Sequence, residues 1–552
     1  LCGDPFAVVE AMTIAAYATG CEKGYLYVRA EYPLAHQRVQ RAVDMARTAG
    51  LLGERILGSE FSFEIELRRG SGAYVCGEET ALFESIEGRR GEPRSKPPFP
   101  VEEGLFGMPT VVNNVETLVN VLPIVIEGAS AFLRVGTSAS SGTRLFCVSG
   151  SIRRPGVYEV PLGIPLRQLI EMAGGPPDGG RVQAVLLGGA AGTFLRADEL
   201  DLRLSLEDTR AAGATLGSGV VLVFDDRVNM HDIVLRIAAF FRDESCGQCV
   251  PCRVGTVRQQ EALHRLVSGA PRGGIAGELA LLDHVGAGMR DASICGLGQT
   301  AFAAVESAIK RLRLFGEPPA AEPAAASAVA VYAAPEATTS PAAMRAGPKA
   351  AASLAPAPAG RSAAANAPTG RTVELTIDGR RVAVSKGTTI LAACRELEIA
   401  VPTLCYLETL KPANACRLCV VEVEGARVLV PSCSRAVERG MVVSTASARV
   451  VLARRMVLEM LASSVDLSTA PRLLEQLREY SAKPERYGPP SPGTDRDYAL
   501  AGHHEAFDPF RAATVAQPVK IDNELYVSDL AKCVLCYKGV EACGEDHQNS
   551  FA

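Results

Sequence analysis

The chain of 552 residues lacks an apolar stretch that could cross a bilayer, because its longest such runs, including residues 118–126, are short and broken by Asn120 and Pro123. It has no excess of positive charge, and a net charge of −5 gives no electrostatic case for nucleic acid. No secretory leader is visible at Leu1, and sixteen cysteines are too sparse for a disulfide scaffold. These absences predict a reduced, cytoplasmic protein without a membrane span, with a peripheral position on the cytoplasmic face of a membrane as the alternative.

Eleven of the sixteen cysteines fall into three clusters, and the first has the clearest spacing. In ESCGQCVPCR, residues 244–253, consecutive cysteines are separated by two residues, and a fourth cysteine follows after 42 more. Three thiolates on a tight Gly/Pro turn, with a remote fourth, form the ligand pattern of a [4Fe–4S] cluster. Zinc is the alternative, although its structural sites usually come as two separated pairs. The predicted ligands are Cys246, Cys249, Cys252 and Cys295.

A second set of cysteines follows a strand pair around Asp378-Gly379 and an amphipathic helix. Its members are separated by gaps of 10, 2 and 13 residues: Cys405, Cys416, Cys419 and Cys433. Four cysteines on loops around a β-grasp sheet suit a [2Fe–2S] cluster, although the first gap exceeds the four residues of plant-type ferredoxins. Zinc is again the alternative. The five cysteines without ligand spacing are interpreted as packing residues: Cys2, Cys21, Cys76, Cys147 and Cys394.

The third set lies in KCVLCYKGVEACG, residues 532–544, which begins like a bacterial ferredoxin repeat. Gly539 occupies the third ligand position, so only Cys533, Cys536 and Cys543 remain. The last cysteine of such a repeat serves a second cluster, and two cysteines alone cannot hold a cubane. This site is therefore expected to be incomplete.

Composition and periodicity predict an α+β multidomain chain. Residues 318–370 contain 23 Ala and 9 Pro with hardly any hydrophobic periodicity, which predicts a disordered linker with an independent redox unit on either side. The expected units are an α/β domain at 1–140, a β-grasp domain at 143–225, a helical [4Fe–4S] domain at 228–315, the linker at 316–370, a β-grasp [2Fe–2S] domain at 371–447, a helical segment at 448–482, a weaker linker at 483–518 and a truncated ferredoxin-like tail at 519–552.

Three further strings carry a family resemblance: KGYLYVRAEYP at 23–33, GAYVCGEETA at 72–81 and PTVVNNVET at 109–117. With the first cysteine motif, they make residues 1–315 resemble the NADH-binding flavoprotein subunit of respiratory complex I, NAD-dependent formate dehydrogenases and bidirectional hydrogenase diaphorases. ACRLCVVEVEG at 415–425 resembles the N-terminal [2Fe–2S] domain of the large complex I iron–sulfur subunit. The resemblance implies that the 143–225 domain is SLBB-like and that 448–482 lacks the usual His/Cys cluster. It also places the glycine-rich flavin loop upstream of Leu1, so the chain is expected to be a fragment at both ends.

The resemblance also implies the cofactor contacts. The expected FMN residues are Gly77, Glu78, Glu79, Val112, Asn113, Asn114 and Thr117, and those beside NADH are Tyr74, Glu79 and Lys96. Their chemistry is suitable, because glycine lets backbone approach a flat ring, amides match a flavin edge and lysine suits a phosphate. Taken singly, each could also be a turn glycine, a surface acid, a loop amide or a solvated lysine.

The function that the resemblance implies is electron transfer between NAD(H) and FMN and on through the [4Fe–4S] and [2Fe–2S] clusters, in a soluble formate dehydrogenase or hydrogenase. Two alternatives are the NADH-input module of complex I and a non-catalytic zinc-binding scaffold. The implied partners are a thioredoxin-like [2Fe–2S] small subunit and a catalytic or quinone-side subunit.

Overall fold

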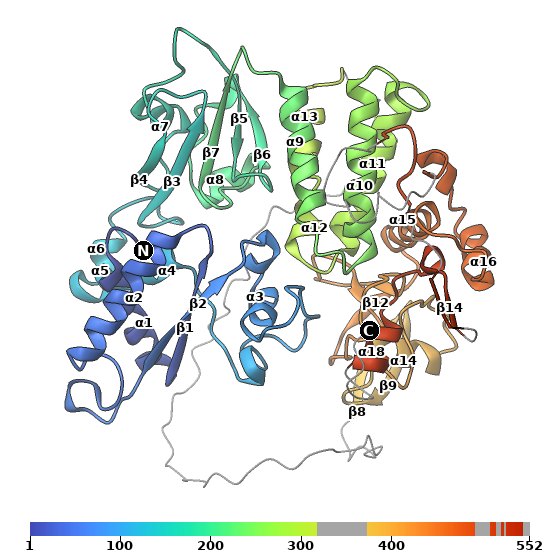
Figure 1. Cartoon of the computed structure of the whole chain (residues 1–552), viewed down its shortest axis with the longest axis horizontal. Coiled ribbons are helices and arrows are strands. Elements are labelled where there is room, and N and C mark those ends of the chain that lie inside the picture. The colour runs from blue at the N-terminus through green and yellow to red at the C-terminus, as the bar shows by residue number, and fades with distance from the viewer. Residues whose placement is uncertain (317–371, 492–507, 515–519, 524–525, 545–552) are drawn as a thin grey trace.

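The computed structural model describes residues 1–316, 372–491, 508–514, 520–523 and 526–544 (Figure 1). Within these residues the chain forms two five-stranded and two two-stranded sheets, interspersed with helices. This agrees with the expected multidomain mixture of helices and sheets. The predicted 316–370 linker lies, apart from Gly316, outside the described residues. Across the part that is described, no helix has both the length and the apolar character needed to cross a membrane.

The N-terminal unit is built on a small parallel sheet. Asp4 caps the first helix, with its carboxylate accepting a hydrogen bond from the Ala7 amide at 3.0 Å, and Gly20 ends it at a φ of 72°. The elements are α1 (Pro5–Thr19), β1 (Lys23–Arg29), α2 (Pro33–Thr48), β2 (Glu64–Gly70), α3 (Glu79–Ile86), α4 (Val115–Val119), α5 (Val121–Glu127) and α6 (Ala129–Phe132). β1 and β2 pair in parallel, and their apolar side chains share a core with α1 and α2.

The second unit is a five-stranded sheet in the order β4-β3-β7-β5-β6. Its elements are β3 (Thr143–Gly150), β4 (Gly156–Pro161), α7 (Leu166–Met172), β5 (Val182–Leu187), β6 (Thr193–Arg196), α8 (Leu206–Ala211) and β7 (Val220–Asp225). β3 and β7 are parallel and the other pairs are antiparallel. Gly174 follows α7 closely, at a φ of 84°, a left-handed conformation typical of the residues after a helix end.

A helical unit follows, comprising α9 (Met230–Asp243), α10 (Val250–Val267), α11 (Gly274–Ala292), α12 (Gly296–Thr300) and α13 (Ala303–Lys310). In the fourth unit the sheet order is β11-β10-β12-β8-β9. It contains β8 (Thr372–Ile377), β9 (Arg380–Ser385), α14 (Ile390–Glu396), β10 (Val420–Val423), β11 (Val430–Pro431) and β12 (Val442–Ser444), and is followed by α15 (Ala448–Ser464) and α16 (Pro471–Glu479). The predicted hairpin turns at Asp378-Gly379, both at positive φ.

The two halves of the chain are packed together, so the expectation of independent redox units is wrong. Helix α15 lies along α10 and α11 (Figure 1), and their apolar side chains form one core. Polar contacts add to it: Arg449 pairs with Asp291 at 2.8 Å, and Arg417 donates to the Ala292 carbonyl at 2.5 Å. The sequence predicts a helical segment at 448–482, but not which helices cover it.

The described ends of the predicted 483–518 linker are also packed. Tyr487 and Ala512 are buried, and two arginines of α10 hold the segment 508–514. Arg265 donates to the Pro509 carbonyl at 2.7 Å, and Arg258 donates to that of Ala513 at 2.8 Å. Composition alone predicted a linker here, because the side chains that satisfy these carbonyls lie more than 240 residues away in the sequence.

This packing determines what we expect from limited proteolysis. The composition of residues 318–370 predicts preferential cleavage there, giving two fragments on a denaturing gel. Because α15 shares a core with α10 and α11, we expect the nicked halves to elute together in size-exclusion chromatography without denaturant. Separate elution of the two halves would contradict the packed arrangement.

Candidate functional site: two cysteine centres and a nucleotide turn

The first cysteine set converges where helices begin. Cys249 precedes α10, Cys252 lies in its first turn, Cys295 precedes α12, and Cys246 lies in the loop after α9. Gly247 allows this loop to turn, at a φ of 81°. Burial raises the pKa of the Cys246 thiol to about 11 and that of Cys295 to about 12, with neighbouring thiols adding to both shifts. Thiols this basic become ligands only when a bound cation displaces their protons, which fits an iron–sulfur centre.

The second set is buried and arranged as two pairs. The Sγ atoms of Cys405 and Cys416 lie 3.3 Å apart, as do those of Cys419 and Cys433. Within each pair, the hydrogen bond between the thiols lowers one pKa, that of Cys416 to about 6, and raises the other. Two thiols per metal is the donor set of a [2Fe–2S] cluster, so the residues fit the group.

A structural zinc ion needs about four ligands around one point. Within the ranges that the structure describes, no group of three His, Cys, Asp or Glu side chains is placed as it would be around a single metal ion.

A backbone hydrogen bond joins the two ligand loops directly. The Val250 amide, next to Cys249, donates to the carbonyl of Ala415, next to Cys416, at 3.0 Å. Cys249 and Cys416 are both buried and belong to one apolar core. The two sets of thiols are therefore separated by a short, water-excluded path.

The predicted nucleotide residues form a charged turn before α3. Glu78 caps this helix, accepting from the Thr80 and Ala81 amides, each at 2.9 Å. The Lys96 ammonium contacts Glu78 at 2.8 Å and Glu79 at 2.5 Å. Two carboxylates thus neutralise Lys96. From the sequence, Lys96 is expected beside a phosphate of NADH, and this pairing is not predicted. Glu79 is the more exposed of the two acids and is the one available to a ligand.

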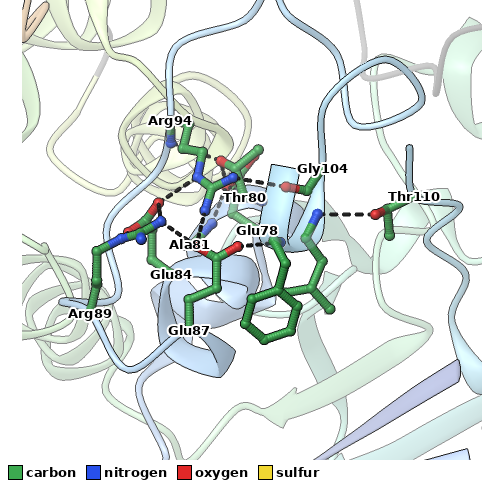
Figure 2. Close-up of polar contacts among 11 residues, drawn as sticks. Glu78, Thr80, Ala81, Glu84, Glu87, Arg89, Arg94, Gly104 and Thr110 are labelled. Carbon is green, nitrogen blue, oxygen red and sulfur yellow. Dashed lines mark hydrogen bonds and ion pairs between the residues drawn. The ribbon is translucent and has the colours of Figure 1, made fainter. Parts of the chain in front are cut away.

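A network of ion pairs fixes the loop that carries Lys96 (Figure 2). Arg94 contacts Glu84 and Glu87 of the α3 region and donates to the Gly104 carbonyl at 3.0 Å. Arg89 pairs with the same two carboxylates. Burial and these arginines act in opposite directions on Glu84, and the net result is a lowered pKa. The network keeps loop 88–110 on α3 and so positions the Glu78–Lys96 contact.

Tyr74 links this turn to the first cysteine set. Its amide donates to the carboxylate of Glu244, two residues before Cys246, at 2.9 Å, and its ring meets Phe240 edge-on at 5.1 Å between centroids. The loop also reaches the cysteines through Arg90, which donates to the Cys246 carbonyl. The predicted nucleotide and cluster residues are therefore brought together.

The predicted flavin residues lie in two separate segments of the chain. Gly77 has no positive φ, and a Cβ added there would meet nothing within 4 Å, so the fold itself does not require glycine. A ligand lying close to the backbone in that space would explain why residue 77 is glycine. Val112, Asn113, Asn114 and Thr117 are exposed, and Asn114 caps α4 by accepting from the Thr117 amide at 2.7 Å. Among the described residues, no hydrogen bond or ion pair joins this segment to the Gly77 turn.

Cys533 and Cys536 are partly buried, and Cys536 contacts the core that holds the first cysteine set. Tyr537 lies beside Glu92 and Cys246. The side chain of Cys543 lies outside the described residues. Of the cysteines interpreted as packing residues, Cys76 and Cys394 are buried and Cys21 is partly buried, but Cys2 and Cys147 are exposed, so that interpretation is wrong for these two.

Two residues beside the second cysteine set had no sequence signal. Asn414, at a φ of 56°, has its side-chain amide within hydrogen-bond distance of Ser95, Cys433 and Ser434. Arg417 lies between two ligands in sequence and bonds to the Ala292 carbonyl. Only their contacts across 100 or more residues reveal them.

Family models match four parts of the chain. They are described as the Nuo51 FMN-binding domain at residues 1–123, the SLBB domain at 145–191, the NADH-ubiquinone oxidoreductase-F iron-sulfur binding region at 232–314 and a 2Fe-2S iron-sulfur cluster binding domain at 370–448. These matches confirm the expected FMN, [4Fe–4S] and [2Fe–2S] cofactors.

Individual relatives match the first part of the chain. The HndC subunit of the NADP-reducing hydrogenase of Solidesulfovibrio fructosivorans is 47% identical over 303 residues, covering 54% of this chain and 60% of that protein. The NADH-quinone oxidoreductase F 2 subunit of Rhizobium meliloti is 43% identical over 311 residues, covering 56% and 73%. A crystal structure of an NAD⁺-reducing [NiFe]-hydrogenase in the air-oxidized state matches with a TM-score of 0.51 and 38% identity, covering 58% of this chain and 54% of that chain. The chain thus spans only part of the length of these relatives.

Proposed function

The chain belongs to the family of the NADH-quinone oxidoreductase F subunits, and from this premise we propose that it moves electrons between NAD(H) and FMN and on through two iron–sulfur centres. FMN, when bound, exchanges a hydride with the nicotinamide and single electrons with the clusters. The protein's own residues bind and orient these groups. The thiols of Cys246, Cys249, Cys252 and Cys295 would hold the [4Fe–4S] cluster, and those of Cys405, Cys416, Cys419 and Cys433 the [2Fe–2S] cluster.

The observation that carries this proposal is the bond between the Val250 amide and the Ala415 carbonyl. It joins the ligand loops of the two centres inside a core from which water is excluded. On the other side, Tyr74 and Arg90 tie the nucleotide turn to the Cys246 loop. Contacts therefore connect the nucleotide turn to the first cysteine set, and the first cysteine set to the second.

Within the nucleotide turn, we assign Glu79 and Tyr74 to NADH and Gly77 to the close approach of FMN. Glu78 acts as the helix cap, and Lys96 holds both acids in place. The exposed amides of Asn113 and Asn114, with Val112 and Thr117, would complete the flavin contacts. We also propose that each of the two five-stranded sheets belongs to a β-grasp fold.

For the whole protein we favour a soluble NAD-dependent formate dehydrogenase or hydrogenase in the cytoplasm, because a ferredoxin-type domain is fused to the flavoprotein in one chain. The expected partners are a thioredoxin-like [2Fe–2S] subunit and a catalytic subunit. The NADH-input module of complex I, with a quinone-side subunit, is the second candidate, favoured by the 43% identity to an NADH-quinone oxidoreductase subunit.

Replacing Glu79 with Gln in the holoenzyme tests the nucleotide assignment. The exposed carboxylate is expected to bind the nucleotide, and a hydrogen bond to a charged group contributes about 1.5–3 kcal/mol. We therefore expect kcat/KM for NADH-driven ferricyanide reduction to fall about tenfold or more. Iron content should stay unchanged, because Glu79 contacts neither cysteine set, and flavin content should stay unchanged because this proposal assigns Glu79 to NADH rather than to FMN.

Glu103 provides the matched control, since it is an exposed acid in the loop 88–110 that carries Lys96. Glu103→Gln is expected to leave kcat/KM within about twofold of wild type, as at an ordinary surface position. If Glu79→Gln turned over at the wild-type rate, Glu79 would be removed from the nucleotide site, together with the assignment of Tyr74.

A further inference from the structure

Four arginines are buried in the described residues, and they divide into two kinds. Arg258 pairs with Glu261 at 2.6 Å, and Arg265 pairs with Glu278 at 2.6 Å, all four side chains being at most 1% exposed. These two pairs follow the usual rule that a buried cation has a carboxylate beside it. The other two arginines, Arg417 and Arg454, belong to the unit that carries the second cysteine set and the helix that follows it.

Neither Arg417 nor Arg454 forms an ion pair with any carboxylate in the part of the chain that is described. Arg417 is 4% exposed and donates to the carbonyls of Ala292 at 2.5 Å and Leu429 at 3.2 Å. Arg454 is 3% exposed and donates to the Val420 carbonyl at 2.9 Å and the Tyr480 hydroxyl at 3.1 Å. These acceptors are all neutral oxygens, and the buried Nε of Arg454 has no hydrogen-bond partner among the described residues, so each guanidinium carries a full positive charge without a counterion.

Both guanidinium groups bond to residues close to cysteine ligands. Arg417 stands between Cys416 and Cys419 in sequence, and its partner Ala292 lies three residues before Cys295. The partner of Arg454, Val420, follows Cys419. An iron–sulfur cluster with four thiolate ligands carries net negative charge, and gains one more unit on reduction. An arginine cannot lose its proton to relieve its burial, so it needs such an anion nearby.

We propose that Arg417, supported by Arg454, is the counter-cation of the [2Fe–2S] cluster and raises its reduction potential. The inference rests on the proposed function, because it requires a cluster at Cys405, Cys416, Cys419 and Cys433. A fixed positive charge stabilises the reduced cluster more than the oxidised one, since the reduced state holds one more electron. By raising this potential, Arg417 makes the second centre a better acceptor of electrons from the first.

The test is a redox titration of the reduced [2Fe–2S] EPR signal in the holoenzyme. Arg417→Gln removes the charge and is expected to lower the equilibrium constant for reduction about tenfold, which is about 59 mV for a one-electron couple. Arg417→Lys keeps the charge but loses the planar donor geometry, and should titrate near the wild-type potential. Arg454→Gln should shift the potential in the same direction as Arg417→Gln by a smaller amount.

Arg435 is the matched control, because it lies two residues after Cys433 but pairs with Glu438 at 2.7 Å. Arg435→Gln should leave the potential unchanged. A wild-type potential in Arg417→Gln with full cluster content would overturn the proposal, as would an equal fall in Arg417→Lys. If Arg417→Gln failed to assemble the cluster, Arg417→Lys and Arg454→Gln would decide the question. A wild-type holoenzyme with no [2Fe–2S] signal would instead overturn the proposed function.

Discussion

Replacement of Cys249 with Ser is expected to abolish the low-temperature EPR signal of the reduced [4Fe–4S] centre. Cys249 is 5% exposed and lies at the start of α10, between Cys246 and Cys252 in the ligand loop. A cubane needs four ligands, and a hydroxyl is a much poorer ligand for iron than a thiolate. In the proposed order, the first centre lies between the nucleotide turn and the second centre. The variant should therefore also lose NADH-dependent reduction of the [2Fe–2S] centre, while ferricyanide reduction at the flavin persists.

Two measurements separate this loss from general damage. Cys147→Ser changes an exposed cysteine outside both ligand sets and is expected to leave both signals intact. The [2Fe–2S] signal of Cys249→Ser after chemical reduction should also be retained, because none of its four thiols is changed. A wild-type [4Fe–4S] signal in Cys249→Ser would mean that the spacing of the first motif does not identify ligands.

Glu278→Gln is expected to cause the largest loss of stability in the helical unit. Glu278 is fully buried, accepts two hydrogen bonds from the Arg265 guanidinium and also accepts from the Arg272 amide at 2.7 Å. Removing its charge leaves Arg265 buried without a counterion, and arginine cannot become neutral. Breaking a buried ion pair on one side costs about 3–5 kcal/mol in the free energy of unfolding. Denaturant unfolding followed by far-UV circular dichroism measures this loss.

Glu306 provides the comparison within the same unit. Its partners, Arg290 and Lys310, are about half exposed, so Glu306→Gln should change the free energy of unfolding by about 1 kcal/mol or less. Replacing both members of the buried pair, as in Glu278→Leu with Arg265→Met, should recover much of the loss, because no unpaired charge remains. If Glu278→Gln were no more damaging than Glu306→Gln, the buried pair would not hold α10 to α11.

Local patterns predicted the local features of the fold well. The hairpin at Asp378-Gly379 was predicted because two residues with positive φ between alternating strands leave few other structures possible. The cysteine spacings predict the two ligand sets, because cluster geometry restricts how far apart ligands on one turn can lie, and the ligand assignments stay predictions.

Features that depend on distant partners were missed or misjudged. The segment 508–514 has the composition of a linker, yet two buried arginines of α10 bind its carbonyls. Lys96 was expected beside a phosphate, but two carboxylates already neutralise it. Nothing in the local sequence around Lys96 shows which charge faces it, because the loop that brings it to Glu78 is held by Arg94 and its acidic partners.

The sequence by itself determined the family and the cofactor set, and it predicts the thiols of both cysteine centres, because metal chemistry and turn geometry act over short stretches of chain. Only the tertiary structure decided that Cys249 and Cys416 share one core, that Val250 bonds to Ala415, and that Arg417 is a buried cation without a carboxylate among the described residues. These features depend on which surfaces meet when α15 packs on α10 and α11. Contacts between residues more than 100 positions apart leave no periodicity or spacing in a single sequence, so they appear only when the chain is folded.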